Sequence, residues 1–388
     1  MEKINIAMAG GGTGGHVFPI KSLIQHIYKH PQYFQKIQKI VRFGEKRSLE
    51  YQVFQDLKQD HKSLFFQSII SGKYRRETWF SSRIKNIRDM FKFTYGVLQS
   101  IHYFKKHKIH ILFCKGGYVA LPVVFAAKLL HKKIIVHESD VRSGLVNKIA
   151  SKYADQVFTG FDGVLPKSTT VGQILSDDII NHTSIKNIPQ ENLLEGQELT
   201  PAQKLFYTDP QKTHLLVIGG SQGSKRLYQN LLQSIDENYS IYQNYEIFII
   251  LGKENKNLKS EFSKYKNIHT FDFVSQGDMG LLLKHCDISL TRAGTTSLAE
   301  QKLFNLKIVM VPIPWTHDQY DNAKFYVKKH GDILLDSKDP NYQKNMSDIF
   351  KKYKDFKKKN SKKDIFGEIQ SAKDIIIKAI LSTKTGHK

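Results

Sequence analysis

Cysteine is almost absent from this chain, because its 388 residues contain only Cys114 and Cys286. Two cysteines cannot build the disulfide framework of a small secreted domain or a four-cysteine zinc site. We therefore expect a protein of a reducing compartment.

Long apolar runs are also missing. No stretch approaches the roughly 20 apolar residues that a helix needs to cross a bilayer. The first residues, Met1 to Ala9, lead into a predicted strand and a glycine-rich turn rather than a signal peptide. These observations predict a chain that stays in the cytoplasm.

Acidic residues are outnumbered, since 36 Asp and Glu stand against 59 Lys and Arg and give a formal net charge of +23. This charge favours polyanionic neighbours, which include nucleic acid, an anionic membrane surface and phosphate-bearing ligands. The charge alone does not choose among them, and the lysine-rich stretch Lys351 to Lys363 is more typical of a solvated surface.

The sequence does contain a regular alternation of apolar, β-branched runs with amphipathic stretches. This alternation is typical of βαβ units and parallel sheets, and the chain length suits two domains rather than one. We expect an α/β protein with one Rossmann-like domain in each half. The predicted strands are Ile4–Ala9, Ile109–Cys114, Lys133–His137, Gln156–Thr159, Leu215–Ile218, Ile247–Leu251, Ile288–Thr291 and Ile308–Pro312.

Two glycine-rich turns occupy matching positions: GGGTGGH (10–16) follows the first predicted strand, and GGSQGS (219–224) follows a later one. Apolar residues at helical spacing come after both, so each turn should lie at a helix N-terminus, where backbone amides and the helix dipole favour a diphosphate. One such turn is equally typical of tight strand-to-helix packing. Two in matching positions favour phosphate binding.

Other nucleotide-binding classes fit these turns less well. Neither turn ends in the Gly-Lys-Ser/Thr of a P-loop, which disfavours an ATPase. A nicotinamide dehydrogenase needs an acid about 20 residues after its first turn, at the end of the second strand. Glu45 follows the run Ile40 to Phe43 too late for that spacing.

A third helix start, RAGTTSLAE (292–300), follows the predicted strand Ile288–Thr291. Its glycine and hydroxyl residues suit a diphosphate, and Glu300 lies within reach of sugar hydroxyls. The alternative is an ordinary capped helix with a surface Glu. Elsewhere His, Asp and Glu are scattered, with no Asp-x-Asp motif near the glycine turns, so we expect neither a metal nor a cofactor.

Six motifs occur in the order of one known family: GGTGGHVFP (11–19), GGYV (116–119), HE (137–138), GLVNK (144–148), GGSQG (219–223) and DQYDNA (318–323). On these motifs the chain resembles the MurG family of UDP-N-acetylglucosamine transferases, which convert lipid I to lipid II in peptidoglycan synthesis. The resemblance implies a GT-B fold, in which two Rossmann-like domains with parallel sheets face an interdomain cleft. It also implies inverting transfer of N-acetylglucosamine from UDP-GlcNAc to the 4-hydroxyl of the muramoyl sugar of undecaprenyl-diphosphate-linked lipid I.

The resemblance further implies roles for residues at matching positions. Thr13, Gly14 and Gly15 would line the cleft near the transferred sugar. The loop of Gly116, Gly117 and Tyr118 would face the acceptor diphosphate. The implied donor-binding residues are Ser221 and Gln222 at the phosphate, Val274 beside the uracil, Thr295, Thr296, Ser297, Leu298, Ala299 and Glu300 at the diphosphate and ribose, and Gln319 and Asn322 at the sugar.

Two segments depart from the pattern of that family. HESD (137–140) replaces the usual HEQN, so that Asp140 adds a negative charge where it could accept a sugar hydroxyl. GQILS (172–176) replaces the usual GNPVR, so that Ser176 stands where an arginine would contact donor phosphate. The cations that could replace this charge are Lys225, Arg226 and Arg292.

An inverting transfer needs a base on the acceptor side to take the proton of the attacking hydroxyl. His16 is the first choice, because its ordinary pKa near 6.5 and its place at a helix N-terminus favour a neutral ring at pH 7. Asp140 is the alternative base. Alternatively, His16 has only a structural role at the start of the helix, where its ring hydrogen-bonds the backbone. On the donor side, helix N-termini and hydroxyl groups should stabilise departing UDP without a metal.

The segment Tyr74 to Lys106 combines apolar residues at helical spacing with many Arg and Lys side chains. A stripe of this kind more often faces a core. With surplus aromatics and basic residues it is also typical of an interfacial anchor, and the resemblance implies a patch here for the anionic leaflet that holds the lipid acceptor. We expect a peripheral protein on the cytoplasmic face of the membrane, and no nucleic-acid partner. The stripe consists of Phe80, Ile84, Ile87, Phe91 and Leu98, with Trp79, Phe93 and Val97 on adjoining faces.

The resemblance implies that the acceptor- and membrane-binding domain is 1–172 and the UDP-sugar domain is 173–365, and the composition predicts a linker region at about 174–213. A final helix within 366–388 should pack back on the first domain. Three alternatives remain open: a UDP-sugar 2-epimerase of the same architecture, a glycolipid synthase, and a non-catalytic basic protein that binds a nucleotide or RNA.

Overall fold

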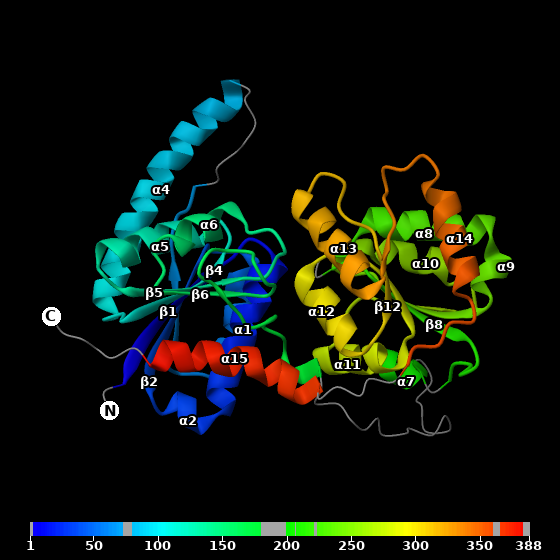
Figure 1. Ribbon diagram of the computed structural model, residues 1–388, viewed down its shortest axis with the longest axis horizontal. Helices are drawn as coiled ribbons and strands as arrows, with labels where there is room; N and C mark the ends of the chain where they lie inside the picture. Colours follow the sequence, from blue (N-terminus) through cyan, green and yellow to red (C-terminus); the bar gives the residue numbers. More distant parts are fainter. Residues whose placement is uncertain are drawn as a thin grey trace. The chain divides into compact units, whose positions relative to one another are not determined.

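The computed structural model describes residues 3–72, 80–179, 199–205, 207–220, 223–359 and 365–382. The chain forms two compact units (Figure 1). The first unit contains the described residues up to Ser176 together with those from Gly367 onward, and the second is Asp177–Phe366. Each unit is described by itself, so the expected cleft between them stays a prediction.

The first unit is built on a seven-stranded, wholly parallel sheet with the strand order β3-β2-β1-β4-β5-β6-β7. Its central strands are nearly continuous apolar runs, because helices bury both faces of a parallel sheet. The strands are β1 Ile4–Gly10, β2 Ile37–Gly44, β3 Leu64–Ser68, β4 Ile111–Gly116, β5 Lys133–Glu138, β6 Gln156–Thr159 and β7 Thr169–Thr170.

Helices cover both faces of this first sheet (Figure 1). One apolar cluster joins α1, α2, α3 and α15 to the sheet, and a second joins α4, α5 and α6 to its other face. The helices are α1 Gly14–Lys29, α2 Pro31–Phe34, α3 Leu49–Lys58, α4 Phe80–Lys106, α5 Ala120–Leu129, α6 Leu145–Ser151 and α15 Ile365–Leu381.

The last helix, α15, packs on the first unit although the second unit precedes it in the chain. Ile376, Ile377 and Ile380 are fully buried in the cluster that contains α1. Asp374 of α15 accepts hydrogen bonds from Nε2 of the buried His26, at 2.9 Å, and from the hydroxyl of Tyr33, at 2.8 Å. Apolar burial and charge-assisted hydrogen bonds therefore hold the end of the chain against α1 and α2.

The second unit repeats the same plan with a six-stranded parallel sheet of order β10-β9-β8-β11-β12-β13. The strands are β8 Thr213–Ile218, β9 Tyr245–Ile250, β10 Ile268–Phe271, β11 Ile288–Thr291, β12 Lys307–Met310 and β13 Ile333–Leu334. The helices are η1 Asp177–Ile179, α7 Pro201–Leu205, α8 Lys225–Glu237, α9 Tyr239–Tyr242, η3 Lys253–Leu258, α10 Lys259–Phe262, α11 Gln276–His285, α12 Thr295–Leu303, α13 His317–His330 and α14 Tyr342–Lys352.

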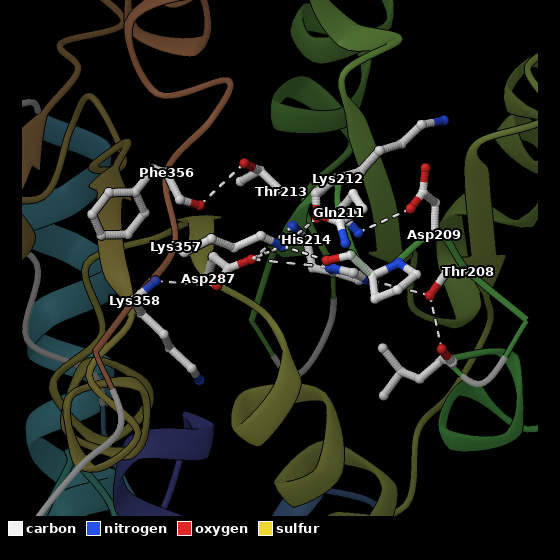
Figure 2. Close-up of polar contacts among 12 residues, drawn as sticks. Thr208, Asp209, Gln211, Lys212, Thr213, His214, Asp287, Phe356, Lys357 and Lys358 are labelled. Carbon is white, nitrogen blue, oxygen red and sulfur yellow. Dashed lines mark hydrogen bonds and ion pairs between the residues drawn. The ribbon is translucent and has the colours of Figure 1, made fainter.

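A buried carboxylate ties the segment after α14 to the amino-terminal edge of this second sheet (Figure 2). Asp287, just before β11, accepts from the backbone amides of His214 at 3.0 Å and Lys358 at 3.1 Å, and from Lys357 Nζ at 3.4 Å. Thr213 Oγ1 donates to the carbonyl oxygen of Phe356 at 3.1 Å. The segment that leads from α14 toward α15 is therefore fixed at the amino-terminal ends of β8 and β11.

The predicted linker region at about 174–213 is partly structured where it is described. Ile174 and Leu175 are buried in the first unit, and Asp177–Ile179 and Pro201–Leu205 are helical. Residues 180–198 lie outside the described residues. The polar composition, rich in Asn, Gln and Pro, gave no sequence signal for these two short helices.

Candidate functional site

The first glycine turn leaves the carboxyl end of β1 and starts α1, as the sequence predicts. Gly12 has a φ of 88°, which L side chains rarely adopt. Thr13 occupies the N-cap position of α1 but makes no capping hydrogen bond. Its hydroxyl lies 2.9 Å from Nδ1 of His16 instead. Gly14 and Gly15 form the first turn of the helix, where their amides lack intrahelical partners.

The His16 ring is half-buried at the edge of the first sheet. Desolvation lowers the pKa of His16 to about 4, the nearby Lys115 and Arg42 lower it further, and Glu138 opposes them. The imidazole is therefore neutral at pH 7, as expected. Burial beside two cations favours the neutral ring, in addition to the helix terminus invoked from the sequence.

Glu138, at the end of β5, is the organising acid of this edge. Its Oε1 accepts from the amides of Ser139 at 2.7 Å and Asp140 at 3.0 Å. Its Oε2 accepts from Ser143 Oγ, the Gly144 amide and Asn147 Nδ2, each at 3.0 Å. Five donors meet this one carboxylate, so Glu138 fixes the loop that carries Asp140.

Another glycine turn of the same unit, Gly116–Gly117, lies at the end of β4 and contacts the turn that follows β1. A side chain at Gly117 would collide with the carbonyl oxygen of Gly11, so the turns approach as closely as glycine permits. Next to them the fully buried Lys115 donates to Ser139 Oγ. Tyr118 points its hydroxyl at Glu45 Oε2, at 2.9 Å. The predicted acceptor loop is thus fixed on one side by a cation and on the other by a carboxylate.

Asp140 and Ser176, the two predicted residues that depart from the family pattern, lie in separate parts of the first unit. Asp140 is half-buried at the edge of the sheet, with its amide held by Glu138. Ser176 is half-buried and is the last residue of the unit before the boundary. The structure therefore brings Asp140, His16 and the glycine turns to the ends of the adjacent strands β1, β4 and β5.

In the second unit, Arg292 joins three strand ends. Its Nη2 and Nε donate to Ser224 Oγ, the N-cap residue of α8, at 2.6 and 3.1 Å, and its Nη1 donates to the Val311 carbonyl at 2.8 Å. Arg292 thus fixes the loops after β8, β11 and β12, so its guanidinium is already used by protein acceptors. The predicted phosphate residues Ser221 and Gln222 lie outside the described residues, between Gly220 and Gly223 with positive φ.

The helix α12 starts at Thr295 after β11, with Gly294 as N-cap. Thr295 and Leu298 are buried, whereas Thr296, Ser297, Ala299 and Glu300 are half-buried. Burial raises the pKa of Glu300 to about 8. The helix therefore combines an N-terminus at the end of β11 with a carboxyl group that titrates near physiological pH.

The loop after β12 is closed by the predicted sugar residue Gln319, whose Oε1 accepts from the Ile313 amide at 3.0 Å. This bond leaves the amide nitrogen of Gln319 as its donor for a ligand. Asn322 is 1% exposed and donates to the Ala293 carbonyl at 3.2 Å. It therefore fixes the loop just before α12. Val274 is buried after β10.

Sequence reasoning assigned no role to several residues at these edges. Lys115 and Glu138 are charged residues at the ends of otherwise apolar strands, and this position could have marked them as site residues. Phe273 and Trp315 are 75% and 76% exposed in the loops after β10 and β12, and nothing in the sequence marked them as exposed. Large aromatic groups at both loops widen the apolar surface available to a ligand of the second unit.

Both sheets reverse their strand order beside the first strand of the unit, at β1/β4 and at β8/β11. Ligands of open α/β sheets bind outside the carboxyl ends of strands at such a switch point. Two Rossmann-like units with glycine turns at these points define a GT-B protein. The chain belongs to glycosyltransferase family 28, because it matches the N-terminal domain of that family over residues 6–159 and the C-terminal domain over residues 214–378.

Curated relatives and solved structures agree with this assignment. The chain is 32% identical over 381 residues to a UDP-N-acetylglucosamine–N-acetylmuramyl-(pentapeptide) pyrophosphoryl-undecaprenol N-acetylglucosamine transferase of Staphylococcus saprophyticus, covering 94% of this chain and 97% of the relative. The crystal structure of Acinetobacter baumannii MurG is similar, with a TM-score of 0.65, 18% identity and coverage of 98% of this chain and 100% of that chain. A UDP-GlcNAc 2-epimerase from Neisseria meningitidis bound to UDP-GlcNAc reaches 0.63 at 13% identity, covering 99% of this chain and 100% of that chain, and shares the fold.

The Glu138 network generates a stability prediction. Glu138→Gln keeps the shape of the side chain but removes the charge and replaces one acceptor oxygen with a donor group. We expect it to lower the free energy of unfolding by about 2–3 kcal/mol, because charge-assisted hydrogen bonds to buried donors are lost. Urea denaturation measures the loss. Ser143→Ala is the graded control, since it removes one of the five donors and should cost about 1 kcal/mol; equal effects would contradict the assignment.

Proposed function

We propose that this protein transfers N-acetylglucosamine from UDP-GlcNAc to the 4-hydroxyl of the muramoyl sugar of lipid I, with inversion, and so makes lipid II. The observation that carries the proposal is the 32% identity with a transferase of that name over nearly the whole length of both chains. The match includes both units, so it covers the glycine turns of the first and the helix α12 of the second.

The donor is assigned to the second unit. The start of α12 offers the positive end of a helix dipole to the diphosphate. Glu300, about one and a half turns further along the same helix, accepts the ribose hydroxyls. Gln319 donates from its amide nitrogen to a sugar hydroxyl, because its oxygen is held by Ile313. The developing charge on UDP is then stabilised by fixed dipoles.

The acceptor is assigned to the first unit, where His16 is the proposed base. A neutral imidazole can take the proton of the attacking hydroxyl on Nε2 only if its own proton is on Nδ1. Thr13 Oγ1, at 2.9 Å, can accept that Nδ1 proton and so fix the required tautomer. Asp140 stays the alternative base, since it lies at the same edge.

A membrane surface is the proposed location of the acceptor-binding unit. The apolar face of α4 carries Met90, Phe91, Tyr95 and Leu98, which are 54–69% exposed. Arg88 and Lys92 flank this face. Large exposed apolar groups beside cations are typical of an interfacial helix, and an anionic leaflet supplies the opposite charge.

Along the same helix, the residues of the predicted stripe and its adjoining faces are divided between exposed and packed positions. Phe91 and Leu98 face outward, whereas Val97 is buried and Phe93 packs edge-to-face on Phe125, with ring centroids 5.4 Å apart. Phe80, Ile84 and Ile87 have no described side chains, and Trp79 lies outside the described residues. No helix among the described ranges is long and apolar enough to cross a membrane.

The proposed function is tested by radiolabelled transfer from UDP-GlcNAc to a lipid I analogue. We expect transfer by the wild-type protein, and a fall in kcat of about 10²- to 10⁴-fold in His16→Ala, because the general base is removed. The KM for UDP-GlcNAc should stay within about twofold. Asp140→Asn, measured in parallel, decides between the two candidate bases.

Other outcomes distinguish the alternatives. Epimerisation of UDP-GlcNAc without an acceptor would favour the 2-epimerase. Transfer to a diacylglycerol or another lipid alcohol, with none to lipid I, would favour a glycolipid synthase. Absence of any UDP-dependent thermal shift, with salt-sensitive RNA binding, would contradict an enzyme of this class.

The pKa of Glu300 generates a pH prediction for UDP binding. The free carboxyl is protonated below about pH 8, whereas ribose hydroxyls donate to the ionised form, so binding releases a proton and strengthens as pH rises. We expect the Kd for UDP to fall by about tenfold between pH 6.5 and 8.5, measured by calorimetry. Glu300→Gln should flatten this dependence; an unchanged slope would show that another group titrates.

The exposed face of α4 generates a vesicle-binding prediction. Phe91→Glu combined with Leu98→Glu should weaken binding to phosphatidylglycerol vesicles by at least about tenfold. The reason is that two large apolar side chains are no longer transferred from water into the membrane. Co-sedimentation measures the change. Phe34→Glu is the matched control, since Phe34 is an exposed aromatic of α2, on the other face of the sheet (Figure 1). Equal losses in both variants would contradict a binding face on α4.

A further inference from the structure

Two charged side chains lie buried beneath the first glycine turn, and the only role given to either so far is the effect of Arg42 on the pKa of His16. Arg42 of β2 is 3% exposed and Glu50 of α3 is 2% exposed. Both line one cavity of about 10 Å³, which is the size of a single water molecule. Desolvation lowers the pKa of Arg42 to about 10 and Glu50 opposes it, so the guanidinium is charged at neutral pH.

Arg42 holds the end of β1 from which the turn departs. Its Nη1 donates to the carbonyl oxygens of Met8 at 3.2 Å and Phe43 at 2.8 Å. Its Nη2 donates to the carbonyl oxygen of Gly10. One guanidinium thus joins the last residues of β1 to the end of the neighbouring strand β2, in a geometry that its rigid, planar group fits.

Glu50 holds the turn itself. Its Oε2 accepts from the Gly12 amide at 3.4 Å, and its Oε1 accepts from the Glu45 amide at 3.3 Å. A Cβ at Gly11 would lie 2.6 Å from Oε1, so the backbone of the turn rests directly on the carboxylate. The Gly12 amide is therefore directed into the protein and toward a negative charge, not outward to a phosphate.

Burying a charge is costly unless it is hydrogen-bonded, and the printed partners of Arg42 and Glu50 are backbone groups of the turn and of the strand ends beside it. These hydrogen bonds fix the position of the turn. The residues that follow the turn are Thr13 and His16, whose mutual contact sets the proposed tautomer. Any movement of the turn moves the start of α1 and the imidazole with it.

We propose that Arg42 and Glu50 are positioning residues for the transfer: together they fix the glycine turn Gly10–Gly12 from below and so hold Thr13 and His16 in place. The inference rests on the proposed function, because it assigns the pair to the acceptor side of that reaction. The turn is then an internally anchored platform for the base, and the acceptor diphosphate is left to the amides at Gly14 and Gly15.

The test uses the full-length protein and the transfer assay with UDP-GlcNAc and a lipid I analogue. Glu50→Ala should lower kcat by about 10- to 100-fold, because a displaced base costs this much, while the KM for UDP-GlcNAc stays within about twofold. Glu50→Gln should recover most of the kcat, since its amide oxygen still accepts from Gly12. The double variant Arg42→Met with Glu50→Leu removes both anchors and should lower kcat at least as much as Glu50→Ala. Because it also leaves buried backbone groups of the turn without partners, its kcat is measured well below its thermal midpoint.

The matched control is Asp374→Asn, which weakens a hydrogen-bonded acid of the same unit far along the chain from the turn. Because Asp374 is half-buried and accepts from His26 and Tyr33, this change should lower the thermal midpoint modestly without lowering kcat at 25 °C. A double variant with wild-type kcat, or a control that loses kcat as much as Glu50→Ala, would overturn the positioning role. Wild-type protein without any transfer would instead overturn the proposed function, and the positioning role with it.

Discussion

The carboxyl ends of parallel strands meet at one edge of each sheet, and the helices that follow start at the same edge. In the first unit this convergence collects the loops after β1, β4 and β5, and in the second unit the loops after β8, β11 and β12. Backbone amides and helix dipoles therefore point where ligands with phosphate groups can bind. The chemistry of both units depends on this constraint of the parallel sheet, because no single loop contributes more than a few of the groups involved.

Buried charge gives these edges their precision. Glu138 orders one loop through five donors, Lys115 fixes a neighbouring loop through Ser139, and Arg292 joins three strand ends of the second unit. Such groups act in a low dielectric, where an unsatisfied partner is expensive, so each loop has one well-defined arrangement. The same low dielectric keeps His16 neutral and Glu300 close to titration at physiological pH.

Much of the fold could be predicted, because strands buried on both faces are nearly continuous apolar runs. Gln156–Thr159 and Ile288–Thr291 were predicted with their observed bounds. Leu64–Ser68 and Ile268–Phe271 are edge or near-edge strands with half-buried residues, so their composition resembled that of loops. The spacing of α4 alone left open whether its stripe faces a core or an interface, since spacing defines a stripe but not the direction it faces.

By itself the sequence determined the α/β class, the two glycine turns, the order of the motifs and the family, because all of these depend on residue types at short spacing. Only the tertiary structure decided which amides of the first turn stay free, why His16 is neutral, and what Arg292 and Glu138 hold. These properties depend on contacts between residues far apart in the chain, such as Gly12 with Glu50, and on burial. Neither is encoded in the local pattern of the sequence.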